Sequence, residues 1–253
     1  MIDILSLTTN KLVEKLRLGE ISSVEVCTLY IERIEKFEKD VLAWENFDKK
    51  KLLEKAEEAD EHRRSGKPLG VLHGLPIAIK DIIGTLEMPT ECGTPIRKKM
   101  SSTQDSEVVN LLKIAGAIVM GKTVTTELAY FHPGKTTNPH DYSRTPGGSS
   151  SGSAAAVAAH MAPLSIGSQT NGSIIRPASY CGVVGYKPSY GLISRSGVLR
   201  QSDRLDTIGV FGKTVEDVAL FAKSLIKKDL YDSSTIHYAA DEMLNICKKG
   251  PLF

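Results

Sequence analysis

Residues 1–70 carry the hydrophobic pattern of amphipathic helices. Apolar side chains recur at steps of three and four, which places them on one helix face. This stripe consists of Val26, Tyr30, Ile34 and Phe37. Ser22 and Glu25 stand just before it at the spacing of a capping box, a common start of a helix. The charged segment 48–64 predicts another helix, so this part of the chain is expected to be helical.

From residue 71 onward the pattern changes to strands that alternate with helices. The segment "LPIAIKD" at 75–81 predicts a buried strand that ends at Lys80. The other predicted strands are 117–122, 162–169 and 182–187, and the predicted helices are 106–114, 126–131, 153–159, a short one from Ser173 and a last one after Thr214. This alternation predicts an α/β fold with a mixed sheet surrounded by helices.

Neither an internal repeat nor a long linker divides the chain. We therefore expect one domain over residues 1–253. Within it, the pattern separates a helical segment (1–70), a core (71–228) and a C-terminal tail (229–253).

Composition and charge narrow the class of protein. Of the 253 residues, 41% are hydrophobic and 25% are charged, as in ordinary globular proteins. The formal net charge of +2 gives no reason to expect nucleic acid or a membrane surface as a partner. The sequence shows no long apolar span and no export signal, so we expect a cytoplasmic protein. Its four cysteines form no CxxC pair, which predicts reduced thiols and no metal site.

Two glycine-containing motifs suggest chemistry that their surroundings do not favour. "GAIVMGKT" at 116–123 satisfies the phosphate-binding pattern G-x-x-x-x-G-K-[ST], but its four middle residues favour a buried strand. "GSSSG" at 148–152 matches a nucleophile elbow around Ser150, for which Asp206 and His237 are formally available. No strand pattern leads into this motif, and His237 lies in a polar segment.

A third interpretation combines two Ser- and Gly-rich turns, 147–153 and 167–173. Each places a serine beside glycine at the start of a predicted helix, where unpaired backbone N–H groups could hold an oxyanion. A nucleophilic serine needs a base, and the six histidines offer no convincing one. Lys80 is the alternative if burial lowers its pKa. The residues alone favour the simpler interpretation of Lys80 as an ordinary surface lysine at a strand end.

Long motifs of the chain resemble the amidase signature family of Ser-Ser-Lys hydrolases. The matching segments are "LPIAIKD", "AIVMGKTVTTELAY", "TNPHDYSRTPGGSS", "GGSSSGSAAAVAA" and "GSQTNGSIIRPASYCGVVGYKPSYG". The likeness extends from residue 20 to residue 225. It implies the amidase signature fold and a cofactor-free enzyme that hydrolyses a linear carboxamide through a serine acyl-enzyme.

The resemblance also assigns roles to individual residues. It makes Ser173 the nucleophile, Ser149 the bridging serine that follows a cis peptide bond, and Lys80 the general base. It maps the oxyanion hole to the backbone N–H groups of Thr170, Asn171, Gly172 and Ser173. The family's frequent acid-Thr-Gly-Gly-Ser reads Gln-Thr-Asn-Gly-Ser here, and Asn171 tolerates the positive φ that glycine would supply. Pro177 follows Arg176 where the amidotransferase subunits of the family usually have Gln, which resembles the free-standing amidases.

Length is the largest departure from the family, whose members are roughly twice as long. We therefore expect an amidase fold that lacks its C-terminal half, with a small-molecule amide as substrate and a separate chain or a homo-oligomer as partner. The alternative is a non-catalytic remnant or one component of an amidotransferase-like complex, similar to the A subunit of glutamyl-tRNA amidotransferase. With half of the fold missing, we expect Lys80 to be hydrated, with a pKa near its usual value of ~10.4.

Overall fold

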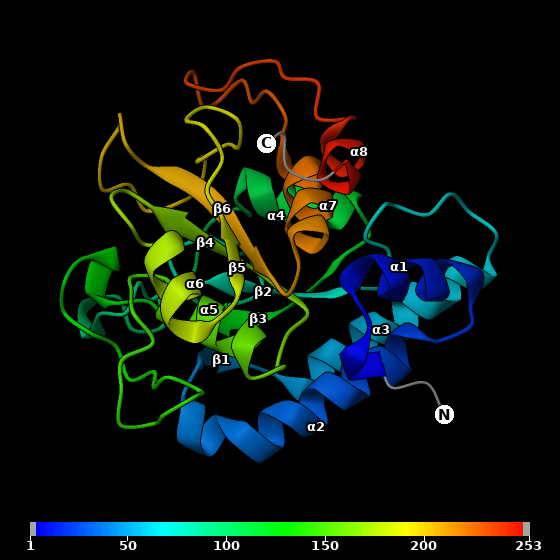
Figure 1. The fold of residues 1–253 in the computed structure, drawn as a ribbon, viewed down its shortest axis with the longest axis horizontal. Helices are drawn as coiled ribbons and strands as arrows, with labels where there is room; N and C mark the ends of the chain where they lie inside the picture. The colour runs from blue at the N-terminus through cyan, green and yellow to red at the C-terminus, as the bar shows by residue number, and fades with distance from the viewer. Residues whose placement is uncertain (1–3, 250–253) are drawn as a thin grey trace.

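The computed structural model describes residues 4–249 and contains a six-stranded mixed sheet with helices on both faces (Figure 1). The strands are β1 (Trp44–Phe47), β2 (Pro76–Lys80), β3 (Ile118–Thr123), β4 (Leu164–Gln169), β5 (Val184–Tyr186) and β6 (Thr207–Gly212). Their order in the sheet is β1-β3-β2-β4-β6-β5. β2 is parallel to β3 and β4, and the other pairs are antiparallel. The predicted α/β fold with a mixed sheet is confirmed.

The helices surround the sheet. They are α1 (Thr9–Leu18), α2 (Ser23–Val41), α3 (Lys49–Arg64), α4 (Glu107–Ile114), α5 (Ser151–Ala158), α6 (Ile175–Cys181), α7 (Val215–Leu225) and α8 (Met243–Lys248). Short 3-10 turns cover Ile4–Ser6, Pro95–Arg97 and Glu127–Ala129. Figure 1 shows α5 and α6 together in front of the strands and α2 below β1, while α3 packs on α2, and α1, α4 and α8 pack on α7. No helix within residues 4–249 is long and apolar enough to cross a membrane.

β2 is the central strand, and it delivers Lys80 to one edge of the sheet. All five of its residues are buried. It pairs with β4 through Ile79 and Ile166 and with β3 through Lys80 and Thr123. Since side chains alternate between the faces of a strand, Lys80 and Ile79 point to opposite sides. Lys80 faces the side that α5 covers.

α5 packs very closely on that face because its residues are small. A Cβ atom on Gly152 would lie 2.4 Å from the carbonyl oxygen of Ala43 and 2.5 Å from the backbone nitrogen of Val124, so no larger residue fits. The Ser153 hydroxyl donates to the Ile166 carbonyl at 3.0 Å, and the Ser165 hydroxyl donates to the Ser153 carbonyl at 2.7 Å. These bonds fix the serine run at the start of α5 against β4.

Sequence and structure differ where elements are short or contain glycine. The capping box predicted at Ser22 and Glu25 is present at the start of α2. β1 and β6 were not predicted, because β1 has four residues and glycines interrupt the apolar pattern of β6. The helix predicted at 126–131 is a 3-10 turn, and the one predicted from Ser173 begins two residues later as α6.

Asp217 joins the starts of two helices, and its removal should destabilise the fold. Its buried carboxylate accepts from the backbone N–H of Thr9 at 2.7 Å and of Thr214 at 3.2 Å. Replacing one partner leaves such donors unsatisfied, so Asp217→Ala should lower the free energy of unfolding by about 3 kcal/mol. Urea denaturation measures this loss. Glu216→Ala, in the same turn, is the control and should cost about 0.5 kcal/mol or less; equal losses would contradict the prediction.

Candidate active site

Lys80 and Ser149 meet at the carboxyl end of β2. The Lys80 Nζ donates to the Ser149 Oγ at 2.7 Å and to the Ser168 Oγ of β4 at 3.0 Å. The Lys80 side chain is 0% exposed and Ser149 is 3% exposed. The strand end, the serine run and β4 thus enclose the amine completely. The hydroxyl of Ser149 is the closest group with which the amine can exchange a proton.

Burial controls the protonation of Lys80. Desolvation lowers its pKa to about 7, although the charge of the Asp206 carboxylate and the Cys92 thiol oppose this shift. The expectation of a hydrated Lys80 with an ordinary pKa is therefore wrong for this chain. The reason is that Lys80 is fully buried, with its amine held by Ser149 before α5 and by Ser168 of β4. A lysine with such a pKa is partly a neutral amine at pH 7 and can accept a proton.

The backbone around Ser149 is held on both sides. The peptide bond between Gly148 and Ser149 is cis, as the resemblance implies. The Arg176 Nη1 of α6 donates to the Gly148 carbonyl at 3.2 Å, and the backbone N–H of Thr126 donates to the Ser149 carbonyl at 3.1 Å. Gly147 has a φ of +76°, a conformation that favours glycine. These contacts set the direction in which the Ser149 side chain points.

Ser173 lies in the loop between β4 and α6 and is 8% exposed. The Gln169 Oε1 at the end of β4 accepts from the backbone N–H groups of Ile174 at 2.9 Å and Ile175 at 3.1 Å, which fixes the loop. Within residues 4–249, the backbone N–H groups of 170–173 donate to no other protein group. The loop therefore offers a set of donors to a ligand. Asn171 is not among the described residues with positive φ, so the turn does not require glycine there.

The structure brings Lys80 and Ser149 into contact, while Ser173 stays separate from them. In the described part of the chain, no hydrogen bond joins the hydroxyls of Ser149 and Ser173. Catalytic hydrogen bonds are often long without substrate and tighten on binding. The predicted site residues thus lie at the ends of the neighbouring strands β2 and β4 and in the loop before α5.

The structure excludes the phosphate-binding interpretation of residues 116–123. Most of this segment is β3, and Lys122 is fully buried in it. Its Nζ donates to the Ile83 carbonyl at 2.6 Å and to the Thr90 hydroxyl at 2.8 Å, and lies 3.4 Å from the Asp81 carboxylate. The Lys122 amine, which would have to reach a phosphate, is therefore already bound by other groups of the protein.

The nucleophile-elbow interpretation also fails. The Ser150 side chain is buried and donates to the Ser168 carbonyl at 3.2 Å. His237 is exposed, and Asp206 accepts a hydrogen bond from Thr170. Ser150 therefore has neither of the partners that the elbow requires. Among residues 4–249, no group of three or more His, Cys, Asp or Glu is arranged to hold a metal.

Two contacts at the site were not predicted from the sequence, that of Ser168 with Lys80 and that of Asp206 with Thr170. Ser168 contacts Lys80, and the Thr170 hydroxyl donates to Asp206 at 2.6 Å. Only strand pairing could have suggested Ser168, because β2 and β4 are neighbours in the sheet. Asp206 follows Thr170 by 36 positions, and no spacing rule connects the two.

Comparisons with known proteins agree on the family. The family model described as Amidase matches residues 25–249. The A subunit of glutamyl-tRNA(Gln) amidotransferase from Fusobacterium nucleatum is 42% identical over 237 residues, which cover 90% of this chain and 48% of that protein. The chain spans about half the length of the curated relatives it matches.

Solved structures give the same result. Peptide amidase from Stenotrophomonas maltophilia matches with a TM-score of 0.87 and 32% identity, over 95% of this chain and 52% of that one. The A subunit of glutamyl-tRNA(Gln) amidotransferase from Thermotoga maritima matches with a TM-score of 0.78 and 36% identity, over 94% of this chain and 51% of that one. The family match over most of the chain, with the shared fold, shows that this protein belongs to the Amidase family.

Proposed function

We propose that this chain carries the catalytic centre of an amidase that hydrolyses a linear carboxamide through an acyl-enzyme. In this proposal Ser173 is the nucleophile, Ser149 relays the proton and Lys80 is the general base. The observation that supports it best is the enclosed contact between Lys80 and Ser149, 2.7 Å long, around an amine whose pKa is lowered to about 7. A surface lysine with an ordinary pKa could not act as a base at neutral pH.

The first half of the reaction forms the acyl-enzyme. The neutral Lys80 amine takes the proton of Ser149, while the Ser149 oxygen takes the proton of Ser173. The Ser173 Oγ attacks the amide carbon, and the carbonyl electron pair moves onto oxygen. The free N–H groups of residues 170–173 are the donors proposed to stabilise this oxyanion. Ser168 receives a hydrogen bond from Lys80 throughout and holds the amine in place.

The second half releases both products. The proton returns from Lys80 through Ser149 to the leaving nitrogen, the C–N bond breaks and ammonia or an amine departs. Water then loses a proton along the same relay and attacks the acyl group, and Ser173 regains its proton as the carboxylate leaves. Each step transfers one net proton between Lys80 and the reacting atoms through Ser149, and none needs a redox or metal cofactor.

A fluorophosphonate that labels activated serines tests the assignment of the nucleophile. We expect covalent label on Ser173, located by peptide mass spectrometry, because this hydroxyl lies beside free N–H donors. Ser173→Ala should remove the label, whereas Ser189→Ala, an exposed serine outside the site, should keep it. Label on Ser150 in the wild-type protein would contradict the proposal.

A second candidate is the same chemistry in one component of an amidotransferase. The similarity to the A subunits of glutamyl-tRNA(Gln) amidotransferases, at 40–43% identity, favours this role over a free-standing enzyme. In such a complex, the nitrogen released from the amide would pass to a partner chain. The measurement is ammonia release by this chain with and without the other subunits of the Fusobacterium amidotransferase. A large stimulation would support the role in a complex, and equal rates would favour the free-standing amidase.

A further inference from the structure

Asp206 connects two loops at the candidate site. Its Oδ1 accepts from the Thr170 hydroxyl at 2.6 Å, and its Oδ2 accepts from the backbone N–H groups of Gln201 at 2.6 Å and Ser202 at 2.9 Å. Asp206 is 8% exposed and immediately precedes β6. Three donors therefore hold one carboxylate, and one of them belongs to the loop of Ser173. Both oxygens are used, which fixes the orientation of the carboxylate.

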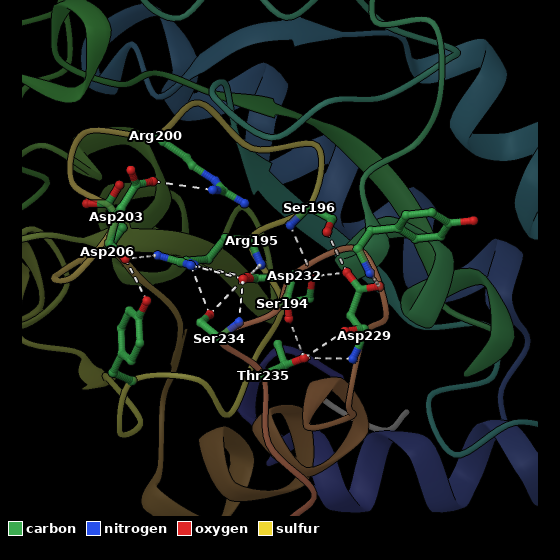
Figure 2. Close-up of polar contacts among 12 residues, drawn as sticks. Ser194, Arg195, Ser196, Arg200, Asp203, Asp206, Asp229, Asp232, Ser234 and Thr235 are labelled. Atoms are coloured by element: carbon green, nitrogen blue, oxygen red, sulfur yellow. Dashed lines mark hydrogen bonds and ion pairs between the residues drawn. The ribbon is translucent and has the colours of Figure 1, made fainter.

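The segment that presents Asp206 is itself anchored. The Arg195 Nη1 donates to the Asp203 carbonyl at 2.8 Å, and the Tyr190 hydroxyl donates to the same oxygen at 2.6 Å. Arg195 in turn pairs with Asp232 through two hydrogen bonds of 3.0 Å, and both side chains are buried (Figure 2). This network ties residues 200–206 to the chain after α7. The loop that carries Asp206 is thus anchored through Asp203 to the buried Arg195–Asp232 ion pair.

We propose that Asp206 is a positioning residue for amide hydrolysis, because it holds the Thr170 hydroxyl and so fixes the loop of N–H donors around Ser173. The inference rests on the proposed function. Thr170 is the first residue of that loop and follows β4 directly. The Gln169 side chain holds the other end of the loop at α6. With both ends held, the four N–H groups keep one arrangement before substrate binds, which is the requirement for an effective oxyanion hole.

The charge of Asp206 has a second, measurable effect. Among the ionisable groups near Lys80, the Asp206 carboxylate raises the pKa of the lysine against the larger effect of burial, and Cys92 acts in the same direction. Burial raises the pKa of the Cys92 thiol, so it stays neutral at pH 7. Removing the negative charge of Asp206 should therefore lower the pKa of Lys80 further. A purely structural residue would not change this titration.

The experiment compares the rate of fluorophosphonate labelling of Ser173 across pH in four proteins. Asp206→Asn should slow labelling at least tenfold, since loss of a whole oxyanion donor costs about 100-fold or more. It should also move the acidic midpoint of the rate to lower pH. Thr170→Val should slow labelling similarly but keep the wild-type midpoint, because the Asp206 charge remains. Thr170→Ser keeps the donor hydroxyl and should stay within about threefold of the wild type.

Controls separate this inference from the proposed function. Absence of label on Ser173 in the wild-type protein would overturn the proposed function. Given wild-type labelling, rates in Asp206→Asn and Thr170→Val within about threefold of the wild type would overturn the positioning role of Asp206. Thermal unfolding of each variant gives the folded fraction, and rates are compared per folded molecule. If Asp206→Asn slowed the labelling of Ser173 but left the acidic midpoint of its pH profile unchanged, this result would also count against the inference.

Discussion

Lys80→Met should abolish labelling and hydrolysis while making the protein more stable. Loss of the base should reduce the acylation rate by about 10⁴-fold, as in other hydrolases that lose a member of the catalytic group. The stability gain follows from the pKa of about 7 in the folded chain against 10.5 in an ordinary lysine. Between about pH 7 and pH 10.5 the unfolded chain binds one proton more than the folded chain. Lys80 therefore increasingly destabilises the folded state as the pH falls through this range. Removing it should add on the order of 4 kcal/mol at pH 7 and below.

The stability gained in Lys80→Met should depend on pH in a definite direction, and this dependence tests the lowered pKa of Lys80. The advantage of Met over Lys80 should be full below about pH 7 and should disappear as pH rises toward 10.5. Urea denaturation at pH 6 and pH 10 measures this difference. Lys122→Met is the matched control, because burial lowers the pKa of Lys122 too, but its amine lies 3.4 Å from the buried Asp81 carboxylate, which opposes that shift. It should destabilise the protein by about 3 kcal/mol or more, since the carboxylate loses its cation. A loss of stability in Lys80→Met at pH 7 would contradict a lowered pKa.

The acylation rate should rise with pH across neutrality, with a midpoint near pH 7. Only the neutral amine of Lys80 can accept a proton, and its pKa is lowered to about 7. Below that value the neutral fraction of the amine falls about tenfold for each pH unit, so the rate at pH 5 should be about 100-fold below its plateau. Fluorophosphonate labelling between pH 5 and pH 9 measures the profile. A flat profile, or a midpoint near 10, would remove Lys80 from the role of base.

Much of the site was predictable because its residues lie in long motifs. Ser149, Ser173 and Lys80 each stand at a break between a glycine-rich turn or a strand and the next element. What the sequence could not decide was the state of Lys80. A lysine at a strand end is exposed or buried according to the loops that cover it, and these come from residues far along the chain. The covering serine run begins 69 positions after Lys80.

The contacts of Asp206 and Ser168 were out of reach for a related reason. Asp206 meets Thr170 only because β6 pairs antiparallel with β4, which places the start of one strand beside the end of the other. β6 itself was hidden by Gly209 and Gly212, which interrupt its apolar pattern. When a strand is not predicted, the contacts that its neighbours make with it cannot be predicted either. Local rules therefore found the elements with strong periodicity and missed the pairing that assembles them.

The proposed base, Lys80, lies on a strand, whereas the proposed catalytic serines, Ser149 and Ser173, lie in loops, and this difference affects which parts of the protein can change. A one-residue insertion in β2 would turn Lys80 to the opposite face and shift every residue after it. Loops accept insertions and substitutions far more readily. Mutational drift or laboratory selection for new substrates is therefore expected to change exposed loop residues, such as many of those in 127–145, rather than β2. Selection would have to preserve the register of β2 against β3 and β4, because that register keeps Lys80 on the face covered by α5.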